Sequence, residues 1–384
     1  MNLRDHTTVT KRRQALEKNL SVDLTNIGKF SLDEKIASSK NCENMIGAIQ
    51  VPVGVAGPLQ INTTTLQKTV FIPLATTEGA LVASVSRGCK AITQSNGTTV
   101  ISKKVGITRA PVFVVDNLVA GKNFIEWIET NFKKIKEITE STSSHLTFLD
   151  IKSWQLGRNV FLRFRFNSQD AMGMNMATIA VSKAVAFIES NTDAQCIAVS
   201  GNMCVDKKPN FLNFIEGRGY SISAEAIISP EIVAAILKTT PHALYEVAQR
   251  KILYGSLLAG SIGANAQFAN ILAALFLATG QDIAHVAECS TGITTIEVRS
   301  DGSLYAAVSL PDLVVGTVGG GTTLATQKEA LSILGVAGGN AGKNAQKFAE
   351  IIGGAVLAGE LSLLASLAEN SLATAHQKLG RGQK

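Results

Sequence analysis

The sequence predicts an α+β protein, in which a ferredoxin-like βαββαβ domain is inserted into a large, mostly helical domain built around a central buried helix. Two observations lead to this prediction. Residues 252–281 contain no charged side chain and are dominated by alanine, leucine and glycine. The middle third of the chain instead alternates strand-like and helix-like segments. With 384 residues, of which 46% are hydrophobic, the chain is long and apolar enough for a substantial core.

The apolar run at 252–281 is long enough to cross a membrane, which takes about 20 residues. However, Asn265, Gln267 and Asn270 lie near its middle and would leave three polar side chains in lipid, so a core helix is favoured. The first charge after this run is Asp282. At the edge of a dry core its carboxylate needs a cationic partner or a proton. A simpler interpretation, slightly favoured for Asp282 alone, is that it caps a helix at 283–288.

The remaining elements are predicted from periodicity and caps. Residues 1–40 should form an N-terminal helical arm, with Thr10 as a helix cap. A strand at 70–74 leads into ATTEG at 75–79, which should open a helix through Ala91 with Thr76 or Thr77 as its N-cap. The small domain should span 110–198, between 41–109 and 199–384 of the large domain. Its expected elements are a strand at 112–115, a helix at 122–140, strands at 146–151 and 160–166, a helix at 174–189 and a strand at 197–200. Further helices are expected at 223–239, 241–281, 283–289, 323–334, 341–357 and 359–377, with a strand pair near 293–309.

Composition narrows the possible partners. The net charge is +6, but lysines and arginines are scattered and aromatic residues make up only 5%, so nucleic acid is disfavoured as a partner. A phosphate-rich small molecule fits the positive charge equally well. The five cysteines show no CxxC spacing, which favours reduced thiols in the cytoplasm and argues against structural zinc, and no other metal site is predicted. The first residues contain no apolar stretch typical of a secretory signal.

Two stretches contain residues suited to acid–base and oxyanion chemistry. SGNMCVDKKP at 200–209 places Lys207 in a loop after a strand, where a lysine held near carboxylates can stabilise an oxyanion. Considered by themselves, the adjacent Lys207 and Lys208 are more simply interpreted as solvated surface charges. Glu78 is predicted in the first turn of its helix, and a simple capping glutamate is the more common case. His376 should end the last helix, where the dipole favours an imidazolium; a plain C-terminal histidine is equally consistent.

Two further stretches are suited to binding a phosphate-bearing ligand. DAMGMNM at 170–176 places Gly173 at a helix start, where free N–H groups can hold a phosphate, although its methionines are equally typical of core packing. GTVGGGT at 316–322 allows close approach to a ligand, and a tight structural turn is the alternative. No GxGxxG motif follows a strand, so a Rossmann fold is not supported.

Together these stretches resemble the 3-hydroxy-3-methylglutaryl-CoA (HMG-CoA) reductase family. The likeness runs in order from about residue 41 to His376. It rests on ENMIG at 43–47, VPVGVAGPL at 51–59, ATTEGALVAS at 75–84, RGCKA at 87–91, DAMGMNM, SGNMCVDKKP, IEGRG at 215–219, ANAQFANILAALFLATGQD at 264–282, GTVGGGT and LAGELSL at 357–363. DAMGMNM and GTVGGGT are more similar to the biosynthetic class I than to the NADH-linked catabolic class.

The resemblance implies a two-step reduction of HMG-CoA to mevalonate and CoA by NAD(P)H, with four catalytic residues. Lys207 matches the lysine that stabilises the oxyanion, and Asp282 the aspartate that holds Lys207 and Glu78. Glu78, kept protonated near Asp282, would donate a proton, and His376 would protonate the leaving thiolate.

The resemblance also implies binding residues. Those matching positions that hold the hydroxymethylglutaryl group are Arg109, Ser200, Lys208, Lys251, Ser261 and Asn270. Those matching positions near CoA are Ser84, Arg87 and Lys238. Those expected at the NADP(H) site are Asp170, Met172, Gly173, Met174 and Asn175, together with Ser143, Ser144, Gly319 and Gly320.

Departures from the family pattern qualify these expectations. Gln267 replaces a usual histidine, which puts one substrate-side hydrogen bond in doubt. Ser144 stands where NADPH-specific members have an arginine, so NADPH should be preferred only narrowly and NADH should be usable.

The resemblance implies a soluble, cytoplasmic homo-oligomer, a dimer or a dimer of dimers, with active sites at the subunit interface and no membrane partner. The alternatives are an NAD-linked, mevalonate-degrading enzyme and a non-catalytic homologue that binds CoA compounds.

Overall fold

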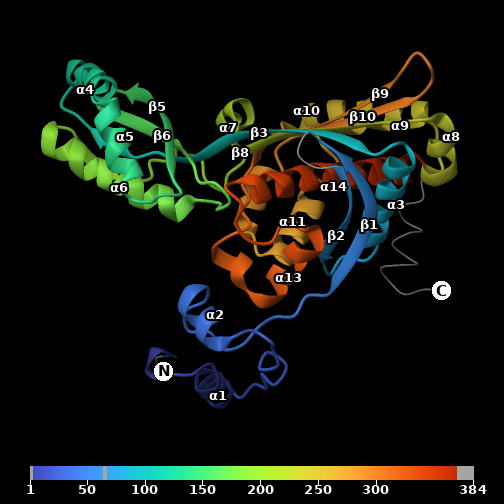
Figure 1. Cartoon of the computed structure of the whole chain (residues 1–384), viewed down its shortest axis with the longest axis horizontal. Helices are drawn as coiled ribbons and strands as arrows, with labels where there is room; N and C mark the ends of the chain where they lie inside the picture. The colour runs from blue at the N-terminus through green and yellow to red at the C-terminus, as the bar shows by residue number, and fades with distance from the viewer. Residues whose placement is uncertain (1–2, 64–66, 370–384) are drawn as a thin grey trace.

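The computed structural model of the chain describes residues 3–63 and 67–369 and has three parts (Figure 1). An N-terminal helical arm extends from one side of the molecule, a small α/β lobe lies at one end, and the largest part surrounds a long helix. The described residues therefore show the α+β organisation that the sequence predicts, with differences in individual elements.

The arm consists of the short helix η1 (Leu3–Asp5), α1 (Val9–Leu20) and α2 (Glu34–Lys40). Thr8, rather than the expected Thr10, caps α1 by accepting a hydrogen bond from the amide of Lys11 at 3.2 Å. The guanidinium of Arg12 donates to the carbonyl of Met45 at 3.1 Å. The arm is thus tied to the ENMIG segment that precedes the first strand.

The large part contains a six-stranded portion of the sheet, with strand order β2-β1-β3-β8-β10-β9. Only the β1–β3 pair is parallel. The strands are β1 (Val53–Asn62), β2 (Gln67–Ala75), β3 (Thr98–Arg109), β8 (Arg218–Ile228), β9 (Ile293–Val298) and β10 (Leu304–Leu313).

The helix expected at 223–239 is wrong in its first half, because residues 218–228 form the central strand β8. The sequence RGYSISAEAII alternates buried and less buried side chains along most of its length, which is the two-residue period of a strand. Alanine and glutamate favour helix on propensity, but burial between β3 and β10 decides the conformation here.

The central helix is α14 (Lys343–Ala368), not the one expected at 252–281. It joins the helix expected at 341–357 to the described part of the one expected at 359–377, of which residues 370–377 lie outside the described residues. Its length and composition would suffice for a membrane span, but 83% of its most apolar window is buried within the fold, as in a core helix. Glycines let neighbours approach closely: a Cβ at Gly88 of α3 (Leu81–Gln94) would lie 1.8 Å from the carbonyl oxygen of Ala358.

The helix expected at 241–281 is interrupted. The chain runs through α9 (Pro241–Val247), the π-helix η3 (Ala248–Gly255) and α10 (Ser256–Ala259), turns at Gly260 with φ 67°, and resumes as α11 (Phe268–Thr279). The buried carboxylate of Glu360 accepts from the amides of Ala266 and Gln267, at 2.8 and 2.6 Å, at the start of α11. These bonds satisfy amides that a helix start leaves free, so the break is stabilised by α14.

The small lobe has the predicted βαββαβ order, except that its first helix is divided in two. Its elements are β4 (Val112–Val114), α4 (Leu118–Thr130), α5 (Phe132–Glu140), β5 (Thr147–Leu156), β6 (Asn159–Asn167), α6 (Met174–Asn191) and β7 (Gln195–Ala198). The antiparallel order β7-β4-β6-β5 is that of a ferredoxin-like sheet. Strand β3 joins the lobes, since it pairs with β8 over 99–106 and with β6 over 107–109.

The remaining elements are short. They are α7 (Phe211–Glu216), α8 (Pro230–Ile232), η2 (Val233–Leu237), η4 (Ile283–His285), α12 (Val286–Cys289), η5 (Gly320–Thr323) and α13 (Ala325–Leu334).

Candidate active site

A cleft of about 670 Å³ lies where the start of α6, the loop before α7, the end of α11 and the glycine loop at 316–322 meet. It collects predicted site residues that lie far apart in the sequence. Those that line it are Arg109, Met172, Gly173, Met174, Asn175, Lys207, Asp282, Gly319 and Gly320.

The ammonium of Lys207 is held on the carboxylate of Asp282, with Nζ 2.7 Å from Oδ2. The backbone of Lys207 is left-handed, with φ 61°, and its amide donates to Oε1 of Glu288 at 2.9 Å. A non-glycine residue in this conformation is strained and persists only where its surroundings impose it. Lys207 is therefore preorganised at the cleft.

Asp282 both caps a short helix and pairs with the ammonium of Lys207. Its Oδ1 accepts from the amide of Ala284 at 3.1 Å and caps η4, while Oδ2 faces Lys207. Partial burial raises the pKa of Asp282, but the hydrogen bond from Lys207 and the nearby ring of His285 lower it by more, so the net shift is downward. The carboxylate is thus held ionised beside the ammonium.

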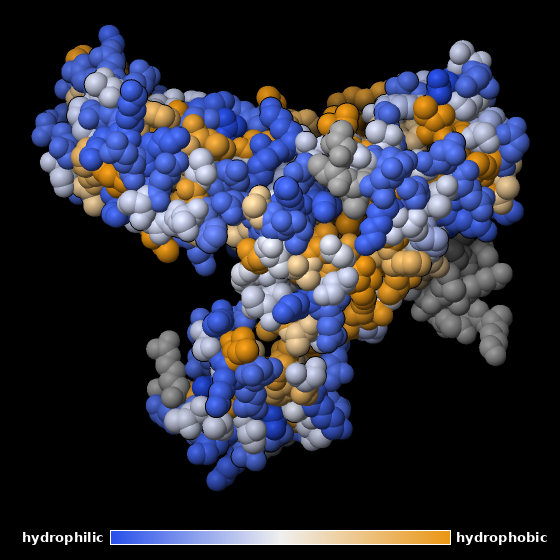
Figure 2. All heavy atoms as spheres, in the orientation of Figure 1, coloured by the Kyte–Doolittle hydropathy of each residue, from blue (hydrophilic) through white to orange (hydrophobic). Residues whose placement is uncertain are grey.

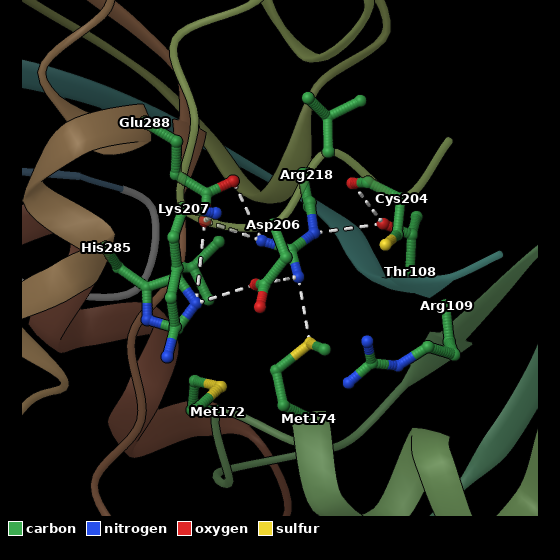
Figure 3. Close-up of polar contacts among 12 residues, drawn as sticks. Thr108, Arg109, Met172, Met174, Cys204, Asp206, Lys207, Arg218, His285 and Glu288 are labelled. Carbon is green, nitrogen blue, oxygen red and sulfur yellow. Dashed lines mark hydrogen bonds and ion pairs between the residues drawn. The ribbon is translucent and has the colours of Figure 1, made fainter. Parts of the chain in front are cut away.

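A fully buried arginine supports the loop that carries Lys207 (Figure 3). The guanidinium of Arg218 lies 2.8 Å from both oxygens of Glu288 and 2.8 Å from Oδ1 of Asp206, and its Nε donates to Oγ1 of Thr108 at 2.9 Å. Burial lowers the pKa of Arg218, but the carboxylates, Glu288 first, raise it by more. Because Asp206 directly precedes Lys207, this network fixes the loop from beneath.

Asp206, Glu288 and the buried ring of His285 also lie close enough to share a metal ion, since their ligand atoms are within 4.8 Å of one another. However, Arg218 already donates to both carboxylates at 2.8 Å. The guanidinium therefore already pairs with the two carboxylates that a divalent ion would need as ligands, so the cluster does not fit a metal site.

The opposite wall of the cleft is suited to an anionic ligand. Gly173 starts the 18-residue helix α6 with φ 97°, and no side chain caps the amides of its first turn. Gly319 and Gly320 have φ 79° and 53°, and a Cβ on either would meet no atom within 4 Å. The wall thus combines a helix N-terminus with backbone that a ligand can approach closely.

The sequence matches the family described as hydroxymethylglutaryl-coenzyme A reductase over residues 8–381. The chain belongs to this family. It is 51% identical to the 3-hydroxy-3-methylglutaryl-coenzyme A reductases of Pyrococcus abyssi and Methanocaldococcus jannaschii, each over 376 residues that cover 96% of this chain and 92% of the relative.

Solved structures share the fold of the hydroxymethylglutaryl-coenzyme A reductase family. The class II 3-hydroxy-3-methylglutaryl-CoA reductase from Streptococcus pneumoniae bound to NADPH superposes with a TM-score of 0.71 and 16% identity, covering 94% of this chain and 98% of that one. At this identity the likeness concerns the fold alone. It gives no support to the class I resemblance that the sequence suggested.

Three residues predicted at the coenzyme site of this reductase lie elsewhere or act differently. Asp170 is buried, and its carboxylate accepts from the amides of Asn340, Gly342 and Ala345 at 2.5, 2.7 and 2.9 Å. It therefore fixes the start of α14 rather than lining the cleft. Ser144, with its neighbour Ser143, lies in the turn before β5 and does not line the cleft either.

Four residues that the resemblance assigns to substrate binding instead contact other residues of the chain. Ser84 and Arg87 of α3 donate to the C-terminal part of α14, Arg87 to the carbonyl of Ser362 at 2.6 Å. In the loop of Lys207, Oγ of Ser200 contacts the sulfur of Cys204 at 3.5 Å. The ammonium of Lys208 donates to the carbonyl of Asp206 at 2.9 Å, and neither Ser200 nor Lys208 lines the cleft.

The remaining predicted residues are exposed at a distance from Lys207. Lys238, Lys251, Ser261 and Asn270 lie on η2, on η3 and around the start of α11. Asn270 lies near the first residue of α11 and Asp282 follows its last, Thr279, so the nine residue steps from Asn270 to Thr279 alone span about 13 Å at 1.5 Å per residue. One small acyl group cannot contact both ends of α11 in a single chain.

Glu78 is not brought to Asp282 either. It lies in the turn between β2 and α3, before the helix rather than in its first turn, and the helix cap is Ala80. Its exposed carboxylate forms no ion pair with Lys207 or with any other cation in the described part of the chain. His376 lies outside the described residues.

The sequence analysis did not identify Arg218, Glu288 or His285. They come from β8, α12 and η4, and no local pattern connects them. The period-two alternation of 218–228 is the signal that could have placed Arg218 inside a sheet.

Proposed function

We propose that the protein reduces HMG-CoA to mevalonate and CoA in two hydride transfers. The observation that carries this proposal is the Lys207–Asp282 pair, 2.7 Å apart, facing a wall formed by the start of α6 and the glycine loop. An ammonium fixed in this way stabilises negative charge that develops on a carbonyl oxygen, and Asp282 keeps it in place. Arg109 also lines the cleft, so its guanidinium group would meet a substrate carboxylate there.

NADPH fits the opposite wall. Its phosphates would lie at the first turn of α6, and Gly319 and Gly320 would allow its backbone contacts. When bound, the nicotinamide supplies the hydride, and the protein supplies position and electrostatic stabilisation. His376 would protonate the thiolate that leaves after the first transfer.

The complete site is formed by two subunits in this proposal. Glu78, Lys251, Ser261 and Asn270 are exposed away from the Lys207 cleft, as expected if they complete the cleft of a second chain. Large apolar side chains are exposed in two places, Val53, Val55 and Phe71 on β1 and β2, and Leu253, Leu257 and Leu258 on η3 and α10. Figure 2 shows hydrophobic surface over the region of β1 and β2. Such patches mark protein interfaces, so a homodimer or a dimer of dimers is proposed.

Finer assignments rest on the sequence. Residues 110–198 would bind the coenzyme, and 41–109 with 199–384 would bind the substrate. The class I assignment rests on DAMGMNM and GTVGGGT alone. A narrow NADPH preference is expected because Ser144 cannot replace an arginine at the 2′-phosphate. A cytoplasmic location is supported by five unpaired cysteines.

The test is to follow NADPH oxidation on addition of HMG-CoA and to quantify the products. We expect two NADPH molecules oxidised for each mevalonate and each CoA formed. A chain that binds HMG-CoA without oxidising NADPH would be the non-catalytic homologue. A chain active only with mevalonate, CoA and NAD would be the degradative enzyme.

A further inference from the structure

The buried histidine His285 links the two carboxylates that flank Lys207. Its ring is 1% exposed and follows Asp282 in the η4 turn. Nε2 lies 3.1 Å from Oδ1 of Asp206, and Nδ1 lies 3.6 Å from Oδ2 of Asp282, the oxygen that contacts Lys207. His285 is thus near both the residue that precedes Lys207 and the residue that pairs with it, and Figure 3 shows its contact with Asp206.

The hydrogen-bonding capacity of the ring matters here. A neutral imidazole donates from only one nitrogen, whereas an ionised carboxylate only accepts. With the proton on Nε2, the lone pair of Nδ1 would face Asp282, and Nδ1 is buried with no hydrogen-bond partner among the described residues. Only a ring that carries both protons can donate to Asp206 and Asp282 together.

The charged groups around the ring favour this form. Carboxylates face it from three elements: Asp206 from the loop of Lys207, Asp282 from the start of η4, and Glu288 of α12, whose Oε1 is 3.5 Å from Nε2. The cations of the cluster are Lys207 and Arg218. Asp312 of β10 contributes little charge, because burial first and Glu288 second raise its pKa well above the ordinary value. The three carboxylates carry one more charge than the two cations, so a positive charge on the ring would be balanced.

We propose that His285 is a positioning residue, whose doubly protonated ring ties Asp282 to Asp206 and so fixes the ammonium of Lys207 at the reacting carbonyl. This inference rests on the proposed reductase function. His285 does not line the cleft, so it acts on the reaction through Asp282 and Lys207. Because Lys207 would serve both hydride transfers, loss of His285 should slow the reduction of HMG-CoA and of free mevaldehyde alike.

Two substitutions separate the two ring nitrogens. In His285→Asn the amide nitrogen takes the place of Nδ1 and can still donate to Asp282. In His285→Gln the amide nitrogen takes the place of Nε2 and can donate only to Asp206. We expect kcat of the glutamine variant to fall by about tenfold to a hundredfold on both substrates, with KM nearly unchanged; the asparagine variant also breaks the bridge but keeps the contact with Asp282, the partner of Lys207, so its kcat should fall less. His242→Gln, at an exposed position of α9, is the matched control.

The two kinetic constants give a readout that a purely structural role would not produce: kcat should fall while KM stays nearly unchanged, and the asparagine variant should be less impaired than the glutamine variant. Equal activity of both variants and wild type, or rescue by glutamine rather than asparagine at equal unfolding midpoints, would overturn the proposal. A wild-type protein without reductase activity would instead refute the proposed function, so the two failures are distinguishable.

Discussion

Replacing Arg218 by methionine tests whether the buried network supports the fold beneath the site. Methionine fills much of the same volume, so little cavity is created. It removes three charge-assisted contacts of 2.8 Å and leaves Glu288, which is fully buried, without its cation. Removing one partner of a buried ion pair costs about 3–5 kcal/mol, a large share of the roughly 5–15 kcal/mol that stabilises a folded protein.

The assay is urea unfolding at several pH values. In the wild type, burial raises the pKa of Asp206, but His285 and Arg218 lower it by more, so its net shift is well below the ordinary value. A depressed pKa stabilises the fold above the unfolded-state value, about 4, and this stability is lost as the pH falls. The difference between Arg218→Met and wild type should therefore be largest near neutral pH and shrink in acid.

A matched control is the exposed pair of Arg250 and Glu246, 2.7 Å apart with the arginine 73% exposed. Arg250→Met should cost no more than about 1 kcal/mol. If Arg218→Met is no less stable than Arg250→Met, the network contributes nothing measurable and the account of the loop's rigidity is wrong.

Three further predictions concern the reaction. His376→Gln should impair reduction of HMG-CoA far more than that of mevaldehyde, because only the former expels a thiolate; equal kcat losses on both substrates would contradict this role. Ser144→Arg should raise the ratio of kcat/KM for NADPH over NADH by about tenfold or more, since a bidentate arginine–phosphate contact contributes roughly 1.5–3 kcal/mol; an unchanged ratio would place the 2′-phosphate elsewhere. Mixing inactive Lys207→Ala and Glu78→Gln chains should restore up to about a quarter of wild-type activity if subunits exchange freely and each site takes one residue from each chain. No recovery after verified exchange would favour a site within one chain.

The small lobe could be predicted from the sequence because its signals are local. Strands such as 160–166 and the helix at 174–189 carry their own periodicity, and the structure shows them in the predicted order as β6 and α6. The exception is the helix expected at 122–140, which divides at Asn131 between α4 and α5.

The large part was harder to predict because tertiary contacts override local preference. Ala224, Glu225 and Ala226 favour helix locally, but residues 218–228 are held as a strand by β3 and β10. The apolar run at 252–281 lacks charge throughout, yet Glu360, almost a hundred residues later, stabilises the break before α11. No window of the sequence contains both partners.

The candidate site could likewise be predicted only in part from the sequence. Lys207 and Asp282 were found through their motifs, and the structure places their charged atoms 2.7 Å apart. Arg218 lies in the IEGRG segment, to which no chemical role was assigned, and His285 lies in no recognised motif; their roles arise only from the meeting of β8, η4 and the Lys207 loop. Asp170 is the opposite case. It lies within a recognised motif, but its carboxylate accepts hydrogen bonds from backbone amides at the start of α14 and does not line the cleft.

The central claim is that the ammonium of Lys207, held on Asp282, stabilises the oxyanion in both hydride transfers. The most direct measurement is kcat of Lys207→Ala with HMG-CoA and, separately, with mevaldehyde, alongside its unfolding midpoint. The account predicts a loss of at least about a hundredfold on both substrates, equivalent to roughly 3 kcal/mol of transition-state stabilisation, with the midpoint nearly unchanged. Near-normal turnover by a folded Lys207→Ala protein on either substrate would contradict it.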